Sequence, residues 1–182
     1  MTFEALDREV RFDGHMIKAG VEHYRYDDGS EVSRDKVWHP GAVGVVAVDA
    51  ESIWLTRQPR ETVGAQASLE IPAGKLDVEG ESPLQTAKRE LSEEIGQRAE
   101  RWEEITAFYT SPGFSDERIW LYHATGLSED PESEPDAGER IEIVRWPLDR
   151  LDDAVAQCED SKTLIGLLWL ARRRVHSSSG RA

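Results

Sequence analysis

The segment between residues 82 and 96 constrains the fold most, because it holds the start, the body and the end of one amphipathic helix. Ser82 suits the N-cap, Pro83 suits the first helical position, and Gln85, three positions after the cap, completes a capping box. Gly96 is typical of the residue that ends a helix. Between these signals, apolar residues recur at helical spacing, at Leu84, Ala87, Leu91 and Ile95. We therefore expect a helix over 82–95 with one face buried in a core.

Two glutamates, Glu90 and Glu94, stand one helical turn apart, so their carboxylates come close together. They lie beside the apolar stripe, where they lose hydration as well as repelling each other. A divalent cation relieves both costs, and an all-oxygen site suits Mg²⁺ or Mn²⁺. Taken alone, the pair also fits a solvated acidic helix face, which is the commoner meaning of this spacing. The residues around the helix decide between the two interpretations.

A longer pattern surrounds the pair, since residues 74–96 read G-x6-E-x7-R-E-L-S-E-E-I-G. This pattern resembles the Nudix box, G-x5-E-x7-R-E-U-x-E-E-x-G-U, in which U is a bulky aliphatic residue. Two departures are present: six residues instead of five separate Gly74 from Glu81, and Gln97 replaces the last aliphatic residue. The extra residue precedes the helix and leaves the spacing of the helical glutamates unchanged. The pattern therefore favours a metal site over a solvated face.

The resemblance implies a magnesium-dependent hydrolase of pyrophosphate bonds, with Mn²⁺ as the alternative metal. The implied fold is an α/β/α sandwich with a mixed sheet, preceded here by N-terminal antiparallel strands. The implied metal ligands are the carboxylates of Glu90 and Glu94 and the carbonyl of Ala73, with Glu93 in a supporting catalytic role. Arg89 would pair with an acidic neighbour and orient the helix. The box residues with an implied structural role are Gly74, Glu81, Arg89 and Gly96.

Three features outside the box resemble the ADP-ribose pyrophosphatase branch of the family. Residues 70–76 read E-I-P-A-G-K-L, which is close to the E-x-P-A-G motif of that branch. Residues 111–117 read S-P-G-F-S-D-E, with a proline at the distance from the box that marks ADP-ribose hydrolases, and residues 58–60 read Q-P-R. The resemblance covers residues 40–170 and is weaker before them. It implies hydrolysis of ADP-ribose, a nucleoside diphosphate sugar, to AMP and ribose 5-phosphate.

Two alternatives stay open at this point. The substrate can be another nucleoside diphosphate sugar, such as GDP-mannose, because Pro112 alone also fits an ordinary turn and Arg60 an ordinary surface charge. The domain can also be a sensor that binds ADP-ribose without cleaving it. The complete set of helical glutamates argues against a sensor, since a pure binder has no need of them.

The base that orients or deprotonates the attacking water is expected in a late acidic segment, residues 138–143. Glu139 fits this role better than Glu142, because it ends a loop whereas Glu142 lies within the following strand. Both also fit the interpretation of solvated charges. Arginines bind phosphate in a bidentate manner or stack on a base, and they head the substrate-binding candidates. These candidates are Arg34, Arg57, Arg60, Glu70, Pro112 and Phe114.

The net charge of −14 disfavours nucleic acid and anionic membranes as partners, and a small anionic substrate then needs a bridging cation. The single cysteine, Cys158, excludes an internal disulfide, and no apolar run at the N-terminus resembles a signal peptide. The longest apolar run, near residues 164–171, is too short to cross a bilayer. We therefore expect a cytoplasmic protein and, on the family resemblance alone, a homodimer formed through the N-terminal strands.

The 182 residues fit one α/β domain with additions at both ends. We expect N-terminal strands over 1–40, the Nudix domain over 41–176 and a disordered tail over 177–182. Within the domain, strands are expected at 41–48, 53–58, 105–109, 119–124 and 141–146, and closing helices at 148–158 and 162–174. Residues 61–68 and 127–138 are expected to form loops.

Overall fold

The computed structural model describes residues 1–133, 138 and 140–179, so the predicted base Glu139 lies outside the described residues. The chain divides into two compact units. The first contains Met1–Gly41 together with Phe108–Ile119, and the second contains Ala42–Ala107 and Trp120–Ala182. The first unit thus includes Phe108–Ile119, a segment far along the sequence, which the predicted division at residue 40 assigns to the Nudix domain.

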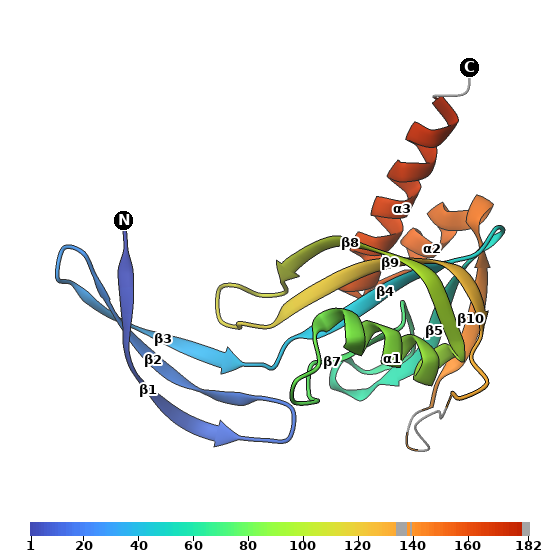
Figure 1. The fold of residues 1–182 in the computed structure, drawn as a ribbon. Coiled ribbons are helices and arrows are strands. Elements are labelled where there is room, and N and C mark those ends of the chain that lie inside the picture. Colours follow the sequence, from blue (N-terminus) through green and yellow to red (C-terminus); the bar gives the residue numbers. More distant parts are fainter. Residues whose placement is uncertain (134–137, 139, 180–182) are drawn as a thin grey trace. The chain divides into compact units, whose positions relative to one another are not determined.

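The first unit is built on a three-stranded antiparallel sheet in the order β1-β2-β3 (Figure 1). Its strands are β1 (Phe3–Asp13), β2 (Lys18–Tyr26) and β3 (Glu31–Trp38). All of β1 is exposed to solvent, whereas Val21 of β2 is buried. The predicted N-terminal antiparallel strands are confirmed.

The second unit is built on a mixed seven-stranded sheet with the central order β10-β5-β4-β9-β8, and β6 pairs with β5 while β7 pairs with β4. The strands of this sheet are β4 (Ala42–Val48), β5 (Ser52–Arg60), β6 (Ala65–Glu70), β7 (Ala73–Lys75), β8 (Gln97–Tyr109), β9 (Arg118–Glu129) and β10 (Glu142–Pro147). The helices are α1 (Pro83–Ile95), α2 (Leu151–Gln157) and α3 (Ser161–Ser179), with short 3-10 turns η1 (Glu61–Val63) and η2 (Leu148–Arg150).

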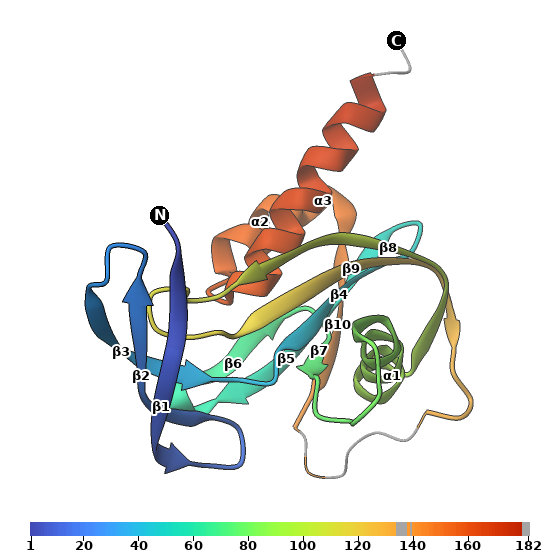
Figure 2. The same cartoon turned by 60° about the vertical axis from the view of Figure 1, so that its left-hand side comes forward.

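Helices cover both faces of this sheet, with α1 on one side and α2 and α3 on the other (Figure 2). Val45 of β4 belongs to the same core cluster as Ala87 and Leu91 of α1. The next residue, Val46, faces α3, because a Cβ added to Gly166 would lie 2.8 Å from its Cγ2. Successive residues of a strand point to opposite faces, so β4 is buried on both sides, which explains its continuous apolar run. The predicted α/β/α sandwich is confirmed.

Three segments differ from the sequence-based expectation. Residues 61–68 hold η1 and most of β6 instead of a loop, β9 continues to Glu129, and α3 continues to Ser179 inside the tail expected to be disordered. β6 pairs with β5, with Leu69 opposite Arg57. Its extended form therefore depends on hydrogen bonds to a neighbouring strand and not on its own alanine- and serine-rich sequence. None of the described helices is both long enough and apolar enough to span a membrane.

Candidate metal and phosphate site

The helix that carries the candidate metal ligands, α1, begins and ends as the sequence predicts. The Ser82 N–H donates to Gln85 Oε1 at 2.9 Å, and the Gln85 N–H donates to Ser82 Oγ at 3.4 Å, which completes the capping box. Gly96 ends the helix with a φ of 64°, in the left-handed region that favours glycine. Ala87 and Leu91 are fully buried. The caps and the buried stripe together fix the rotation of α1 and so the direction of its acidic face.

The two candidate metal ligands of α1 meet the strand β7. Glu94 is 7% exposed, and its Oε2 accepts the backbone N–H of Ala73 at 2.9 Å. The Glu90 carboxylate lies directly on Gly74, because a Cβ added to that glycine would be 1.9 Å from Glu90 Cδ. The absence of a side chain at Gly74 therefore makes room for a carboxylate. The structure brings Ala73, Glu90 and Glu94 together, as the family pattern implies.

Arg89 joins the acidic residues around this point. Its Nη1 donates to Glu90 Oε1 and to Glu93 Oε2, each at 2.7 Å, and its Nε lies 3.3 Å from both oxygens of Glu81. Burial lowers the pKa of Arg89, but the charges of Glu90, Glu93 and Glu81 outweigh it, so the pKa is raised overall. Arg89 is thus a fixed positive charge that orients three carboxylates. The Thr86 hydroxyl also donates to Glu81 Oε2, at 3.0 Å, and so helps to position the Glu81 carboxylate.

The donor atoms fit a hard divalent cation. Glu90, Glu94 and the Ala73 carbonyl supply only oxygen, which is the ligand type that Mg²⁺ and Mn²⁺ prefer. Over residues 1–133, 138 and 140–179, no group of three or more His, Cys, Asp or Glu side chains is arranged to hold a metal ion. The structure thus describes two carboxylates beside β7, and the Ala73 carbonyl stays the third ligand that the family pattern implies. Mg²⁺ commonly completes such a set with water and substrate phosphates.

Glu142, the second candidate base, is exposed at the start of β10. It stands directly opposite Arg57 in the antiparallel pairing of β10 with β5. Residues that are directly opposite share one face of a sheet, so this acidic group and this candidate phosphate ligand lie on the same side.

Glu70, which the sequence assigned to substrate binding, is 1% exposed and lies inside a group of charges. Arg60 binds both of its oxygens, with Nε–Oε1 at 2.7 Å and Nη2–Oε2 at 2.8 Å, and Lys162 Nζ lies 2.6 Å from Oε2. Burial raises the pKa of Glu70. The hydrogen bond from Arg60 and the charge of Lys162 have the larger, opposite effect, so the pKa is lowered to about 2. Glu70 is therefore an ionised anchor for Arg60. Sequence reasoning missed Lys162, because nothing near it in the chain signals a partner 92 positions away.

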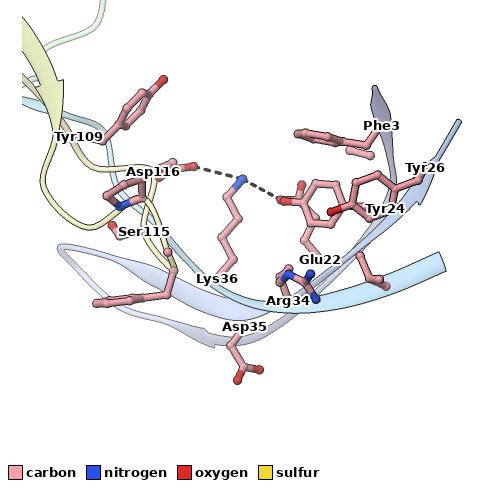
Figure 3. Close-up of a pocket in the computed structure, with 15 residues that line it drawn as sticks. Phe3, Glu22, Tyr24, Tyr26, Arg34, Asp35, Lys36, Tyr109, Ser115 and Asp116 are labelled. Atoms are coloured by element: carbon pink, nitrogen blue, oxygen red, sulfur yellow. Dashed lines mark hydrogen bonds and ion pairs between the residues drawn. The ribbon is translucent and has the colours of Figure 1, made fainter. Parts of the chain in front are cut away.

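The other substrate-binding candidates lie in the first unit, where they line one cavity of about 530 Å³. Arg34 comes from β3, and Pro112 and Phe114 come from the loop that precedes β9. Figure 3 shows Lys36 reaching across this cavity, with Nζ 2.7 Å from Glu22 and 3.5 Å from Asp116. The aromatic walls of the cavity are Phe3, Tyr24, Tyr26, Tyr109 and Phe114. The pairing of Lys36 with Asp116 was not predicted, because it depends on contact between segments far apart in sequence.

The sequence that forms α1 and β7 matches a known protein family. The model of the NUDIX domain matches residues 38–164, which include β4, the box and the start of α3. The chain belongs to the Nudix family. This Nudix hydrolase is 39% identical to an ADP-ribose pyrophosphatase of Bacillus subtilis (strain 168) over 171 residues, which covers 92% of this chain and 91% of the relative. It is 37% identical, with the same coverage of both chains, to a methanol dehydrogenase activator of Bacillus methanolicus.

The fold of this Nudix chain also matches a crystal structure of an ADP compounds hydrolase. The TM-score is 0.81, and the match covers 100% of this chain and 98% of the other, at 21% sequence identity. Such a likeness supports the architecture alone. The predicted membership of the Nudix family and the predicted fold are both confirmed.

Proposed function

We propose that this Nudix hydrolase cleaves the pyrophosphate bond of ADP-ribose to AMP and ribose 5-phosphate with the help of Mg²⁺. The observation that carries the proposal is the convergence of Glu90, Glu94 and the Ala73 backbone beside one strand. The choice of ADP-ribose is supported by the relative from Bacillus subtilis, which is named an ADP-ribose pyrophosphatase and matches almost the whole chain.

The residues divide the work according to their charge. Glu90, Glu94 and the Ala73 carbonyl would hold Mg²⁺, which would neutralise phosphate charge and lower the pKa of a bound water. Arg89 orients Glu90 and Glu93, because it donates to both carboxylates. Hydrolysis adds water to one phosphorus and breaks the bridging P–O bond, and a carboxylate base accepts the proton that the water loses.

The base is assigned to the acidic segment that leads into β10. Glu142 is the candidate that the structure describes, on the same sheet face as Arg57. Glu139, which the sequence favours, is the candidate outside the described residues. Glu93 accepts a hydrogen bond from Arg89 Nη1 at 2.7 Å, which suits the supporting role that the family pattern implies.

Each of the two units holds its own candidates for contacts with a substrate. Arg57 and Arg60 lie near the end of β5 and suit phosphate oxygens, since a guanidinium binds them in a bidentate manner. Arg34, Pro112 and Phe114 line the cavity of the first unit, whose aromatic walls suit a stacked adenine.

We also propose a homodimer, in which β1 is covered by a second copy of the chain. All eleven residues of β1 are exposed, and Phe3 and Phe12 are 65% and 55% exposed. A long exposed edge strand with apolar side chains favours association. Light scattering after gel filtration tests this proposal, and a monomer at micromolar concentration would contradict it.

Product analysis tests the proposed activity. The protein is incubated with ADP-ribose, GDP-mannose and related nucleoside diphosphates, with Mg²⁺, with Mn²⁺ or with EDTA, and the products are identified. We expect AMP and ribose 5-phosphate from ADP-ribose only when the metal is present. Faster turnover of GDP-mannose than of ADP-ribose would overturn the substrate, and binding of ADP-ribose without any turnover would favour a sensor.

A further inference from the structure

Lys162, near the start of α3, is an enclosed cation to which the mechanism above gives no role. Its side chain is 12% exposed, and Nζ donates to Glu70 Oε2 at 2.6 Å and to Asp160 Oδ2 at 3.0 Å. Enclosure removes water from an ammonium group, so such a lysine needs matching negative charge. Glu70 supplies that charge from the end of β6, and thereby links α3 to the strands that lead to the candidate metal site.

Glu70 lies between the two cations and is the most buried of the three side chains. The side chains of Lys162, Glu70 and Arg60 are 12%, 2% and 42% exposed, in that order. Arg60 uses Nε and Nη2 to bind Glu70. Nη1 is therefore the nitrogen of Arg60 that these two hydrogen bonds leave for a ligand.

Arg60 binds Glu70, which lies three residues before Ala73 of the candidate metal site. The hydrogen bond to Glu70 raises the pKa of Arg60 most, burial lowers it, and the charges of Glu70, Asp160 and Glu94 raise it. A phosphate held at the candidate metal site would therefore be attracted by the positive charge of the Arg60 guanidinium. The strength of that attraction depends on how much of the positive charge of Arg60 is already balanced by Glu70.

The net charge of this group of side chains depends on Lys162. Arg60 and Glu70 alone would cancel, and Asp160 would then leave a net negative charge beside the phosphate position. With Lys162 present, the four charges of Arg60, Lys162, Glu70 and Asp160 sum to zero. We propose that Lys162 is a positioning residue for substrate binding: by sharing the charge of Glu70, it leaves Arg60 available to a phosphate of the substrate. The inference rests on the proposed function, because it requires Arg60 to contact that phosphate.

Binding measured without turnover tests the proposal. The dissociation constant of a non-hydrolysable ADP-ribose analogue, with a methylene group between the two phosphates, is measured by calorimetry with Mg²⁺ for the wild type, Lys162→Met and Lys88→Met, with circular dichroism to confirm folding. Lys88 is exposed on α1, so its replacement removes the same charge elsewhere in the second unit. We expect Lys162→Met to weaken binding about tenfold, as befits the loss of one charge near a phosphate, and Lys88→Met to match the wild type.

A double variant separates charge sharing from a merely structural role. Glu70→Gln combined with Lys162→Met restores the net charge of zero and removes the unbalanced buried carboxylate, which also protects folding. We expect its affinity to return to within about threefold of the wild type, a smaller change than one buried charge produces. With Mg²⁺, Lys162→Met should raise KM while kcat changes much less.

The outcomes separate the two proposals. A folded Lys162→Met variant with wild-type affinity would overturn the role of Lys162 and leave the proposed function standing. A double variant that binds as weakly as the single variant would overturn charge sharing. If Lys162→Met alone does not fold, the affinity of the double variant relative to the wild type decides the question. A wild type that neither binds nor hydrolyses ADP-ribose would overturn the proposed function and the inference with it.

Discussion

Glu90 and Gly74 lie in direct contact, since a Cβ added to Gly74 would be 1.9 Å from Glu90 Cδ and 2.0 Å from its Oε1. The φ of Gly74 is not positive, so the backbone does not require glycine there. The missing side chain alone lets a helical carboxylate reach the strand that carries Ala73. The glycine at the start of the Nudix box thus has a steric function in this chain.

Gly74→Ala should therefore displace Glu90. We expect kcat/KM with ADP-ribose to fall by more than about tenfold, because a ligand shifted by about 1 Å no longer matches the reactive geometry. Kinetics with Mg²⁺ and calorimetric Mg²⁺ binding measure the effect. Adding Glu90→Asp, which shortens the side chain by one methylene, should regain part of the thermal stability that Gly74→Ala loses. Unchanged kinetics in Gly74→Ala would show that Glu90 is not held against this strand.

Glu94→Gln is expected to abolish most of the activity while leaving the fold intact. The amide oxygen can still accept the N–H of Ala73, so the contact at 2.9 Å is preserved, but the charge that would bind a metal is lost. Because Glu94 is buried beside other carboxylates, its neutralisation should leave the metal-free protein as stable as the wild type or slightly more stable.

Activity assays and thermal melts in EDTA measure these two effects of Glu94→Gln. Glu104→Gln, at an exposed position of β8, is the matched control and should behave as the wild type. Activity of Glu94→Gln close to that of the wild type would remove Glu94 from the metal site.

The sequence predicts the features that depend on neighbours in the chain. The α1 helix is predicted because its caps, its apolar stripe and its final glycine all lie within one short segment. The proximity of Glu90 and Glu94 follows from helical spacing in the same way. Such features can be predicted because the residues that determine them are close together in the chain.

Features that depend on distant contacts are not predicted. The ion pair of Lys162 with Glu70 joins residues 92 positions apart, and neither residue carries a local signal of the other. Residues 65–68 of β6 are expected to be a loop, because their extended form comes from pairing with β5. The same reason explains why Phe108–Ile119 was not assigned to the unit of the N-terminal strands.

The ionised Glu70 makes stability depend on pH in the acid range. Its pKa is about 2 in the folded protein and 4.5 for an unperturbed glutamate, so the unfolded chain takes up the proton first as the pH falls. The stabilisation is therefore complete above about pH 4.5 and is lost as the pH falls towards about 2. Between about pH 5 and pH 3, we expect the free energy of unfolding to fall by roughly 2 kcal/mol more in the wild type than in Glu70→Gln.

Urea denaturation in EDTA at several pH values measures this difference. Both proteins share their other carboxylates, so the comparison isolates the contribution of Glu70. Parallel stability curves for the two proteins would mean that Glu70 has an ordinary pKa in the folded chain.

Thr163 anchors the strand that leads to the metal site, and its hydroxyl should contribute more to stability than its methyl group. Thr163 is fully buried. Its Oγ1 accepts the N–H of Ile71 at 2.9 Å and donates to Asp160 Oδ1 at 2.5 Å. Thr163→Val keeps the shape but leaves the Ile71 N–H without its acceptor, at a cost of about 1–3 kcal/mol. Thr163→Ser keeps the hydroxyl and loses only a methyl group, at a cost of about 0.8 kcal/mol.

We therefore expect Thr163→Val to be less stable than Thr163→Ser in urea denaturation, with equal dependence on denaturant in both variants. Because Ile71 lies two residues before Ala73, Thr163→Val should also lower kcat/KM with ADP-ribose more than Thr163→Ser does. A serine variant as unstable as the valine variant would show that packing of the methyl group, and not the hydrogen bond to Ile71, holds this strand in place.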